Sequence, residues 1–205
     1  MHARLDRYNG QSGHRVGSPD LADLSTSVAG QRGLLSCLTF RQLGGPATVH
    51  LTLWDTEASA AGCPGPGAGP ASPAAEIYQI TATEEGPAAT QTPAYARLMC
   101  FDGARAPEQA AAEDLAGRQR IWPAIRGLGG LVSIHVLRGG DLSSIVVTLA
   151  TSIETLDAAQ QAVRATELTP GADPALLPGP DRVEIHRVIV HHLPAAGPAA
   201  STRGH

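Results

Sequence analysis

Lysine is absent from this chain of 205 residues, in which all 15 basic side chains are arginine and the net charge is −4. Binding to the phosphates of nucleic acid depends on clusters of basic side chains, and none is present, so we expect no nucleic-acid partner. Abundant Ala, Gly and Pro indicate the coding bias of a GC-rich genome, such as that of an actinobacterium. The use of arginine instead of lysine in this chain is therefore no evidence that a site needs the bidentate hydrogen bonding of arginine.

Aromatic residues are also few, at 3% of the chain, so we expect a core of Val, Ile, Leu and Ala. No stretch approaches the roughly 18 apolar residues of a membrane-spanning helix. The polar segment Met1–Gly17 lacks the apolar run of a signal peptide. We therefore expect a cytoplasmic protein with no membrane contact.

Cysteine is scarce, and Cys37, Cys63 and Cys100 have no metal-ligand spacing, so reduced thiols are expected. The adjacent His191 and His192 point to opposite faces of a strand, and no His-x-His or Cys-x-x-Cys set is present. Gly-x-Ser-x-Gly, phosphate-binding loops and dinucleotide glycine motifs are missing too, which excludes the common hydrolases and nucleotide-dependent enzymes. The sequence predicts neither a metal nor a cofactor.

What the chain does contain is an internal repeat. Gly33-Leu34-Leu35-Ser36 returns as Gly130-Leu131-Val132-Ser133, and Thr52-Leu53-Trp54-Asp55-Thr56 returns as Thr148-Leu149-Ala150-Thr151-Ser152. A long period with two copies indicates a duplicated domain, because a solenoid needs at least three units to bury a core. We expect two domains of about 100 residues each.

The second copy, residues 93–193, contains a full set of elements. Strands are predicted at Tyr95–Phe101, Leu131–Leu137, Ser144–Ala150 and Arg182–His192, and helices at Pro107–Ile125 and from a Ser152 cap to about Thr166. The order β-α-β-β-α-β predicts a ferredoxin-like fold, with helices on one face of an antiparallel sheet. The other face is apolar and needs a second sheet, from the sister copy or from a second chain, which leaves a homodimer open.

The first copy, residues 1–88, is less regular. It predicts a helix at Asp20–Gly30, a hairpin over Leu34–Trp54, a short helix from Asp55 and a last strand over Ile77–Thr83. Met1–Gly17 has few β-formers, so the first strand is predicted to be degenerate or missing. Proline and glycine make Cys63–Pro73 a surface loop, and residues 194–205 are expected to form a disordered tail.

Several of these segments resemble the dimeric α+β barrel superfamily, in particular its antibiotic-biosynthesis monooxygenase-like domains. They are Gly129–His135, Ser144–Ala150, Thr151–Glu154, Gly33–Ser36 and the Trp54–Glu57 turn. The resemblance implies an α+β fold in which two ferredoxin-like repeats pack sheet to sheet as a barrel. It also implies a pocket between sheet and helices for a planar phenol, which some members oxidise with molecular oxygen and no metal or flavin.

The two tryptophans are candidate pocket residues. Trp122, late in the first helix of the second copy, is a candidate catalytic residue in the pocket wall, and Trp54 is a candidate substrate contact. The repeat places Ala150 where the first copy has Trp54. For both tryptophans the alternative interpretation is a side chain that fills the core.

His135 is the other catalytic candidate, because a histidine that faces the space between the sheets is suited to take a phenolic proton near neutral pH. Tyr95, Arg97 and His186 occupy neighbouring strand positions and are predicted to form a substrate-binding polar cluster. The alternatives are a hydrogen-bonded structural histidine and a polar set at the surface or an interface. His50 is the candidate equivalent of His135 in the first copy, although it lies on a different strand.

These observations favour a cofactor-independent monooxygenase or related tailoring enzyme that acts on a small aromatic, polyketide-like molecule. Two other interpretations remain open. One is a non-catalytic ligand-binding or scaffold module of the same fold, and the other is a haem-binding or haem-degrading protein, because the superfamily includes both and a fold alone does not give a function.

Overall fold

The computed structural model describes residues 1–9, 28, 30–63 and 75–192. Eight strands of this part form a closed antiparallel barrel in the order β1-β3-β2-β8-β5-β7-β6-β4. The strands are β1 (His2–Asn9), β2 (Leu34–Gln42), β3 (Ala47–Trp54), β4 (Glu76–Glu85), β5 (Tyr95–Phe101), β6 (Leu131–Arg138), β7 (Ser144–Ala150) and β8 (Arg182–His192). The helices are α2 (Glu57–Gly62), α3 (Pro107–Ala116), α4 (Trp122–Ile125) and α5 (Ile153–Arg164), with a π-helical turn, η1 (Gly117–Ile121), and a 3₁₀ turn, η2 (Pro174–Leu176).

The barrel consists of two ferredoxin-like sheets. The N-terminal half (β1–β4) has the order β4-β1-β3-β2, and the C-terminal half (β5–β8) has the order β8-β5-β7-β6. Pairing of β2 with β8 and of β4 with β6 joins the two sheets into a ring. The predicted α+β fold class is therefore confirmed, and the sheet of the other half, rather than a second chain, covers the open face.

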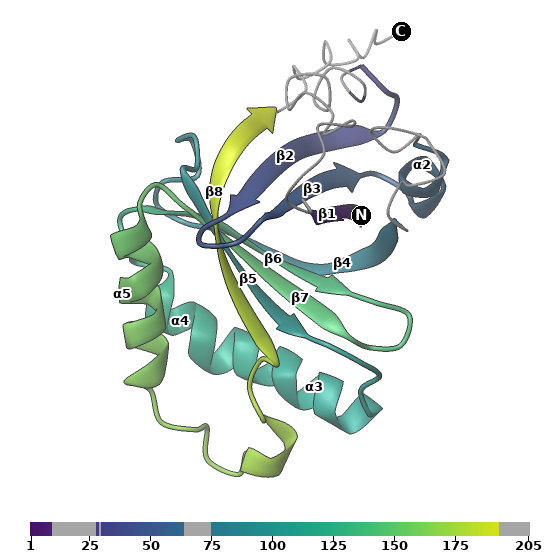
Figure 1. Cartoon of the computed structure of the whole chain (residues 1–205). Coiled ribbons are helices and arrows are strands. Elements are labelled where there is room, and N and C mark those ends of the chain that lie inside the picture. Colours follow the sequence, from purple (N-terminus) through teal and green to yellow (C-terminus); the bar gives the residue numbers. More distant parts are fainter. Residues whose placement is uncertain (10–27, 29, 64–74, 193–205) are drawn as a thin grey trace, which may run out of the picture.

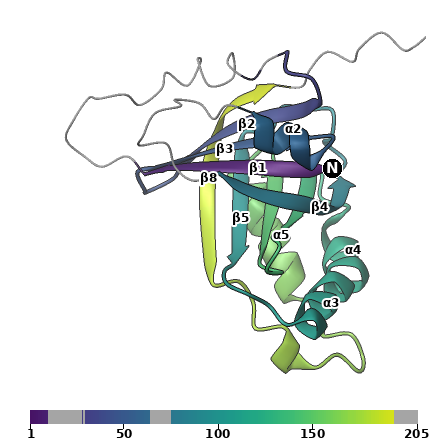
Figure 2. The same ribbon diagram turned by 90° about the vertical axis from the view of Figure 1, so that its right-hand side faces the viewer.

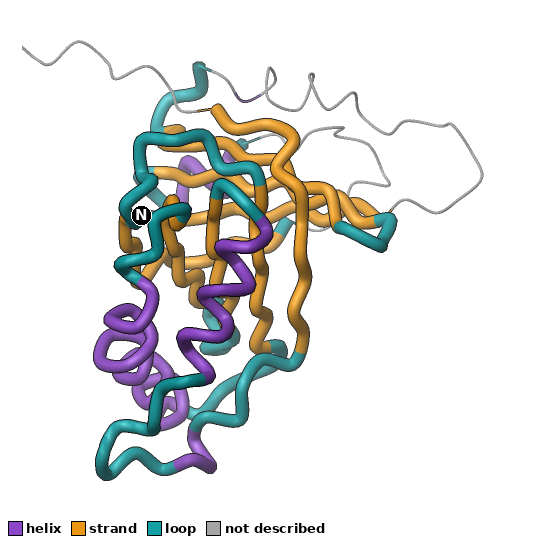
Figure 3. Tube along the Cα trace, turned by 90° about the vertical axis from the view of Figure 1, so that its left-hand side faces the viewer, coloured by secondary structure: helices purple, strands orange, loops and turns teal. Residues whose placement is uncertain are grey.

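The helices lie outside the ring. Figure 1 shows α3, α4 and α5 along the C-terminal strands, and Figure 2 shows α2 over the N-terminal strands. Figure 3 shows α5 beside the α3–α4 segment, over the same strands. Inside the ring, alternate residues of both sheets form the main core, including Leu38, Phe40, Leu51, Leu98 and Val147.

An ion pair also links the two halves. Arg7 of β1 donates to Glu184 of β8 at 2.9 Å, and the Nε2–H of His186 donates to the same carboxylate at 3.0 Å. Burial alone would raise the pKa of Glu184, but the hydrogen bonds from His186 and Arg7 lower it to about 2. The carboxylate is therefore ionised at neutral pH and holds the two sheets together.

The first strand is present, and the prediction that it is degenerate or missing was wrong. β1 pairs with β3 along its whole length and with β4 through residues 2–5. Ala3 and Leu5 point into the core, while Arg4 and Asp6 form an ion pair on the outer face. Weak β propensity is overridden here by pairing on two sides and by this alternation.

The helix predicted over Pro107–Ile125 is continuous but contains η1. The N–H of Trp122 bonds the carbonyl of Gly117, five residues back, and Pro123 has no N–H to continue the α-helical pattern. Nearly all of the predicted Asp20–Gly30 helix, most of the Cys63–Pro73 loop and the 194–205 tail lie outside the described residues. None of the described helices is long and apolar enough to cross a membrane.

The repeated glycine has the same role in both halves. The N–H of Asp55 donates to Gly33 O and the N–H of Thr151 donates to Gly130 O, both at 2.9 Å. A Cβ on Gly130 would lie 2.2 Å from Thr155 Oγ1, so only glycine fits there. The ladders that follow each glycine contain a bulge at the same place, after Leu34 and after Leu131.

Candidate functional site

A pocket of about 660 Å³ lies between the C-terminal sheet and α3, η1, α4 and α5. This volume lies within the usual range of about 300–1,000 Å³ for small-molecule sites. Its apolar walls include Met99 and Phe101 of β5, Val136, Val146, and Ile121 and Trp122 of the helix layer. The walls thus suit a flat apolar ligand.

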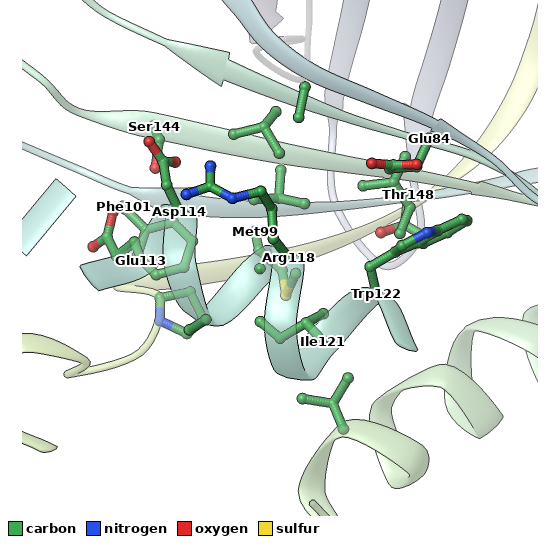
Figure 4. Close-up of a pocket in the computed structure, with 18 of the residues that line it drawn as sticks. Glu84, Met99, Phe101, Glu113, Asp114, Arg118, Ile121, Trp122, Ser144 and Thr148 are labelled. Carbon is green, nitrogen blue, oxygen red and sulfur yellow. The ribbon is translucent and has the colours of Figure 1, made fainter. Parts of the chain in front are cut away.

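The polar side chains of the pocket lie at two ends. In Figure 4, Glu84, Thr148 and Trp122 lie toward one end, and Ser144, Glu113 and Asp114 toward the other. Register partners connect Glu84 to Ile134, Ile134 to Thr148 and Thr148 to Arg97 across the sheet. Three strand spacings, about 14 Å, therefore separate Glu84 from Arg97 along this row.

At the far end, the charge of Arg138 is neutralised. Its guanidinium donates to Glu113 at 3.1 Å, to Asp114 at 2.7 Å and to the carbonyl of Leu142 at 3.1 Å. Only 7% of the Arg138 side chain is exposed, so the two carboxylates compensate a buried cation. The arrangement fixes α3 to β6.

Arg97, by contrast, is buried in the pocket wall and makes no ion pair with the described residues. It is 4% exposed, and its Nη1 donates to Leu156 O at 3.2 Å and to Gln160 Oε1 at 2.8 Å. Its Nε has no hydrogen-bond partner, and no carboxylate of the described residues lies within 4.0 Å. Burial lowers the pKa of Arg97 although the charge of Asp157 acts in the opposite direction, and the guanidinium stays charged at neutral pH.

His135 lies on the opposite face of β6 and does not reach the pocket. Its Nδ1 lies 3.2 Å from Thr83 Oγ1 and its Nε2 lies 3.1 Å from Ser133 Oγ, so both ring nitrogens have partners. Burial lowers the pKa of His135 to about 4. His135 therefore faces the space between the two sheets, as expected, and the pocket wall is formed by the alternate residues Ile134 and Val136.

The predicted cluster of Tyr95, Arg97 and His186 does not form. His186 is fully buried inside the barrel, with its ring centroid 6.1 Å from that of Phe40. Its partner across the ladder is Ala96, so it points away from the face of Arg97. Tyr95 shares a face with Arg97 by alternation, but it does not line the pocket.

The two tryptophans have different surroundings. Trp122 lines the pocket and packs against the cluster that contains Ile134. Trp54 is 1% exposed, packs with Leu34, Cys37 and Ala60 under the helix layer of the N-terminal half, and donates its indole N–H to Thr52 Oγ1 at 2.8 Å. Trp54 therefore fills a core, and only Trp122 remains a candidate ligand contact.

His50 and Cys37 lie beside Trp54 and are unreactive. His50 Nδ1 lies 3.1 Å from Thr39 Oγ1, and its Nε2 lies 3.8 Å from Cys37 Sγ. Burial lowers the pKa of His50 to about 4 and raises that of Cys37 to about 12. Since both groups are neutral at pH 7, they do not form a thiolate–imidazolium pair.

The donor set of the pocket does not fit haem. No histidine, cysteine or tyrosine occurs among the residues that line it, and Met99, which does line it, belongs to a residue type that ligates haem iron together with a histidine. Within the part of the chain that the structure describes, no group of three or more His, Cys, Asp and Glu side chains is placed to hold a metal ion.

Sequence reasoning missed Glu84, Glu113 and Arg138. The signal for Arg138 and Glu84 was available in strand alternation, because they share faces with Ile134 and Ala82. This alternation pattern identifies pocket residues only when the strand face that meets the helices is known. The choice of His135 as a catalytic candidate directed attention to the opposite face.

No family model matches the chain, and no curated protein matches it. Among solved structures, an anthrone oxidase-like protein superposes with a TM-score of 0.60 at 13% identity, over 98% of this chain and 96% of that one. A putative monooxygenase from Fusobacterium nucleatum subsp. nucleatum gives 0.63 at 5% identity, over 94% of each chain. A heme-degrading enzyme from Listeria monocytogenes gives 0.51 at 7% identity, over 91% of this chain and 99% of that one. These likenesses show a shared fold, the dimeric α+β barrel.

Proposed function

We propose that this chain, which has the dimeric α+β barrel fold of monooxygenase-like proteins, oxidises a small polycyclic phenol with molecular oxygen in the pocket of its C-terminal half. The observation that supports this most is the apolar space of about 660 Å³ under Trp122. The row from Glu84 to Arg97 measures about 14 Å between strands, which leaves room for a flat ligand of about three rings.

The proposed reaction replaces one ring C–H by C=O. A phenol and one O₂ give a quinone and one water, and the ring gives up the four electrons that O₂ accepts. One oxygen atom enters the quinone and the other leaves as water. The chain supplies an apolar wall that excludes water, a position for the ring and a group that takes the phenolic proton.

We assign the proton acceptor role to Glu84 in place of His135. Glu84 lines the pocket near Thr148 and Trp122 and makes no ion pair or hydrogen bond among the described residues. Glu113 and Asp114, the other carboxylates of the pocket, are both bound to Arg138. Glu84 is thus the pocket carboxylate that is available to a substrate hydroxyl.

A titration with a tricyclic phenol whose para position is unsubstituted tests the proposal. Binding should quench tryptophan fluorescence, and most of the quenching should be lost in Trp122→Phe but kept in the matched variant Trp54→Phe. In an oxygen electrode, one O₂ should be consumed for each quinone formed. Glu84→Gln should keep the affinity and lower turnover about a hundredfold.

Other outcomes point to the alternatives. Binding without oxygen uptake would identify a non-catalytic ligand-binding or scaffold module. A Soret shift with hemin would show that the protein binds haem although its pocket has no histidine, cysteine or tyrosine. The same proposal includes a cytoplasmic location, a polyketide-like substrate, a homodimer and a division into domains 1–88 and 93–193. Gel filtration and expression of each half separately test the last two.

A further inference from the structure

Arg97 has an equivalent in the other half of the molecule. Arg4 of β1 is the register partner of Thr52, and Arg97 of β5 is the register partner of Thr148. Thr52 and Thr148 are corresponding positions of the repeat. Each arginine also donates from Nη1 to a backbone carbonyl of its helix layer, Cys63 O for Arg4 and Leu156 O for Arg97. The same arginine therefore supports both halves.

The difference between them lies two residues further along the strand. Arg4 donates from Nε and Nη2 to the two carboxylate oxygens of Asp6, at 2.9 and 3.0 Å. The position equivalent to Asp6 is Met99, which lines the pocket. Arg97 therefore has no carboxylate on that edge, and both of its hydrogen bonds leave from Nη1.

Arg97 differs in this respect from the other buried arginines. Arg4, Arg97 and Arg138 are the arginines of the described part with less than 9% of their surface exposed. Arg4 and Arg138 each hold a carboxylate, but Arg97 holds none. The hydrogen bond with Asp6 raises the pKa of Arg4, whereas burial lowers that of Arg97. No carboxylate of the described residues bonds the Arg97 guanidinium, and the charge of Asp157 on α5 acts on it only from beyond ion-pair distance, so a ligand carboxylate would lower the cost of burying this cation.

We propose that the pocket takes an aromatic carboxylic acid, whose carboxylate binds the Nε–Nη2 edge of Arg97 as Asp6 binds the same edge of Arg4. A planar carboxylate matches two parallel N–H groups better than a single phenolate oxygen does. The inference rests on the proposed function in one respect, because it assumes that the pocket holds a flat aromatic ligand. The acid end then lies over β5, and the ring system extends over Thr148 and Ile134 toward Glu84.

Two probes of the same shape test the inference. Anthracene-2-carboxylate and anthracene-2-carboxamide differ in charge at the end that would meet Arg97. In calorimetric titrations of the whole chain at pH 7.5, the acid should bind at least tenfold more tightly than the amide. The amide also reports whether the pocket of each variant is intact.

Three variants identify the group that recognises the acid. Arg97→Met should reduce the preference for the acid over the amide to less than twofold. Met99→Asp restores the internal counterion found in the N-terminal half, so it should abolish the preference as well. Met99→Asn is the matched control, because it has the shape of aspartate without the charge, and it should keep the tenfold ratio whatever its absolute affinity.

The outcomes separate this inference from the proposed function. Equal binding of acid and amide to the wild type would overturn the inference and leave the aromatic pocket standing. An acid preference that survives in both Arg97→Met and Met99→Asp would also overturn it, because another cation, such as Arg118, would then be responsible. If neither probe binds, the aromatic pocket is wrong, and the proposed function and this inference fall together.

Discussion

The two halves of this barrel share a strand framework and differ in what covers it. Both have the same strand order, the same glycine hydrogen bond and the same bulge. In the N-terminal half, Trp54 and the six-residue α2 accompany a filled apolar cluster. In the C-terminal half, Ala150 replaces Trp54, α5 has twelve residues, and a pocket lies between helices and sheet. Among the described residues, the same strand framework thus holds a buried tryptophan in one half and a pocket in the other.

Substitution of the two tryptophans should give the largest difference in stability between the two halves. Trp54→Ala removes a fully buried ring and its hydrogen bond to Thr52, so we expect a loss of about 4 kcal/mol in the free energy of unfolding. Trp122→Ala removes a partly exposed ring beside an existing space and should cost less than about 2 kcal/mol. Urea denaturation measures both, and equal losses would show that the pocket wall is ordinary core.

The two arginines provide the next test. Asp6→Asn removes the negative charge that compensates the buried Arg4. We expect it to destabilise the protein by about 3 kcal/mol. Arg97→Met removes a buried charge that makes no ion pair, so the stability should stay within about 1 kcal/mol of the wild type or rise. A large loss in Arg97→Met would mean that its bonds to Gln160 and Leu156 are what the fold needs.

One buried histidine in each half, His50 and His135, should make the stability of the protein depend on pH. The pKa of His50 and of His135 is about 4 in the folded protein, below the ordinary 6.5. The unfolded chain therefore binds more protons between these values, and stability is lost as the pH falls from 6.5 toward 4. We expect each histidine to contribute a fall of about 2 kcal/mol between pH 7.5 and 4.5. Denaturation of His50→Gln and His135→Gln across this range should each show a shallower slope than the wild type.

Helix caps should give the smallest effect. Thr56 accepts the N–H of Ser59, and Ser152 accepts the N–H of Thr155. We expect Ser152→Ala to cost about 1 kcal/mol, because α5 is long and carries the buried Leu156 and Ala159. Thr56→Ala should cost less, since α2 has a single buried residue, Ala60. The reverse order in thermal denaturation would show that α2 is the more important helix for stability.

Much of the fold followed from the sequence, because periodicity and turn residues are local signals. The bounds of β5, β7 and β8 and the Ser152 cap agree with those predicted. β1 was missed because its evidence is not local. Charged Arg4 and Asp6 conceal a strand whose outer face is covered by α2, where the two side chains form a buried ion pair.

The candidate site was predicted less well, for a reason that concerns the faces of strands. Trp122 was predicted in the pocket wall and Arg97 in a polar cluster with Tyr95 and His186; both Trp122 and Arg97 line the pocket, but the cluster does not form. His135 and His186 were favoured for their chemistry, but each lies one residue out of phase with the pocket wall. Alternation states which residues share a face, and it does not state which face meets the helices.

Ring closure through β8 has a consequence for synthesis on the ribosome. Of the strands that the structure describes, β8 is made after all the others, and it pairs with β2 on one side and β5 on the other. Until residue 192 has left the exit tunnel, both of those strands have unpaired edges. Arg7 also lacks Glu184, its partner in the ion pair, which follows it by 177 residues. A nascent chain that stalls in this interval exposes two adhesive edges, which makes it a natural client for a chaperone.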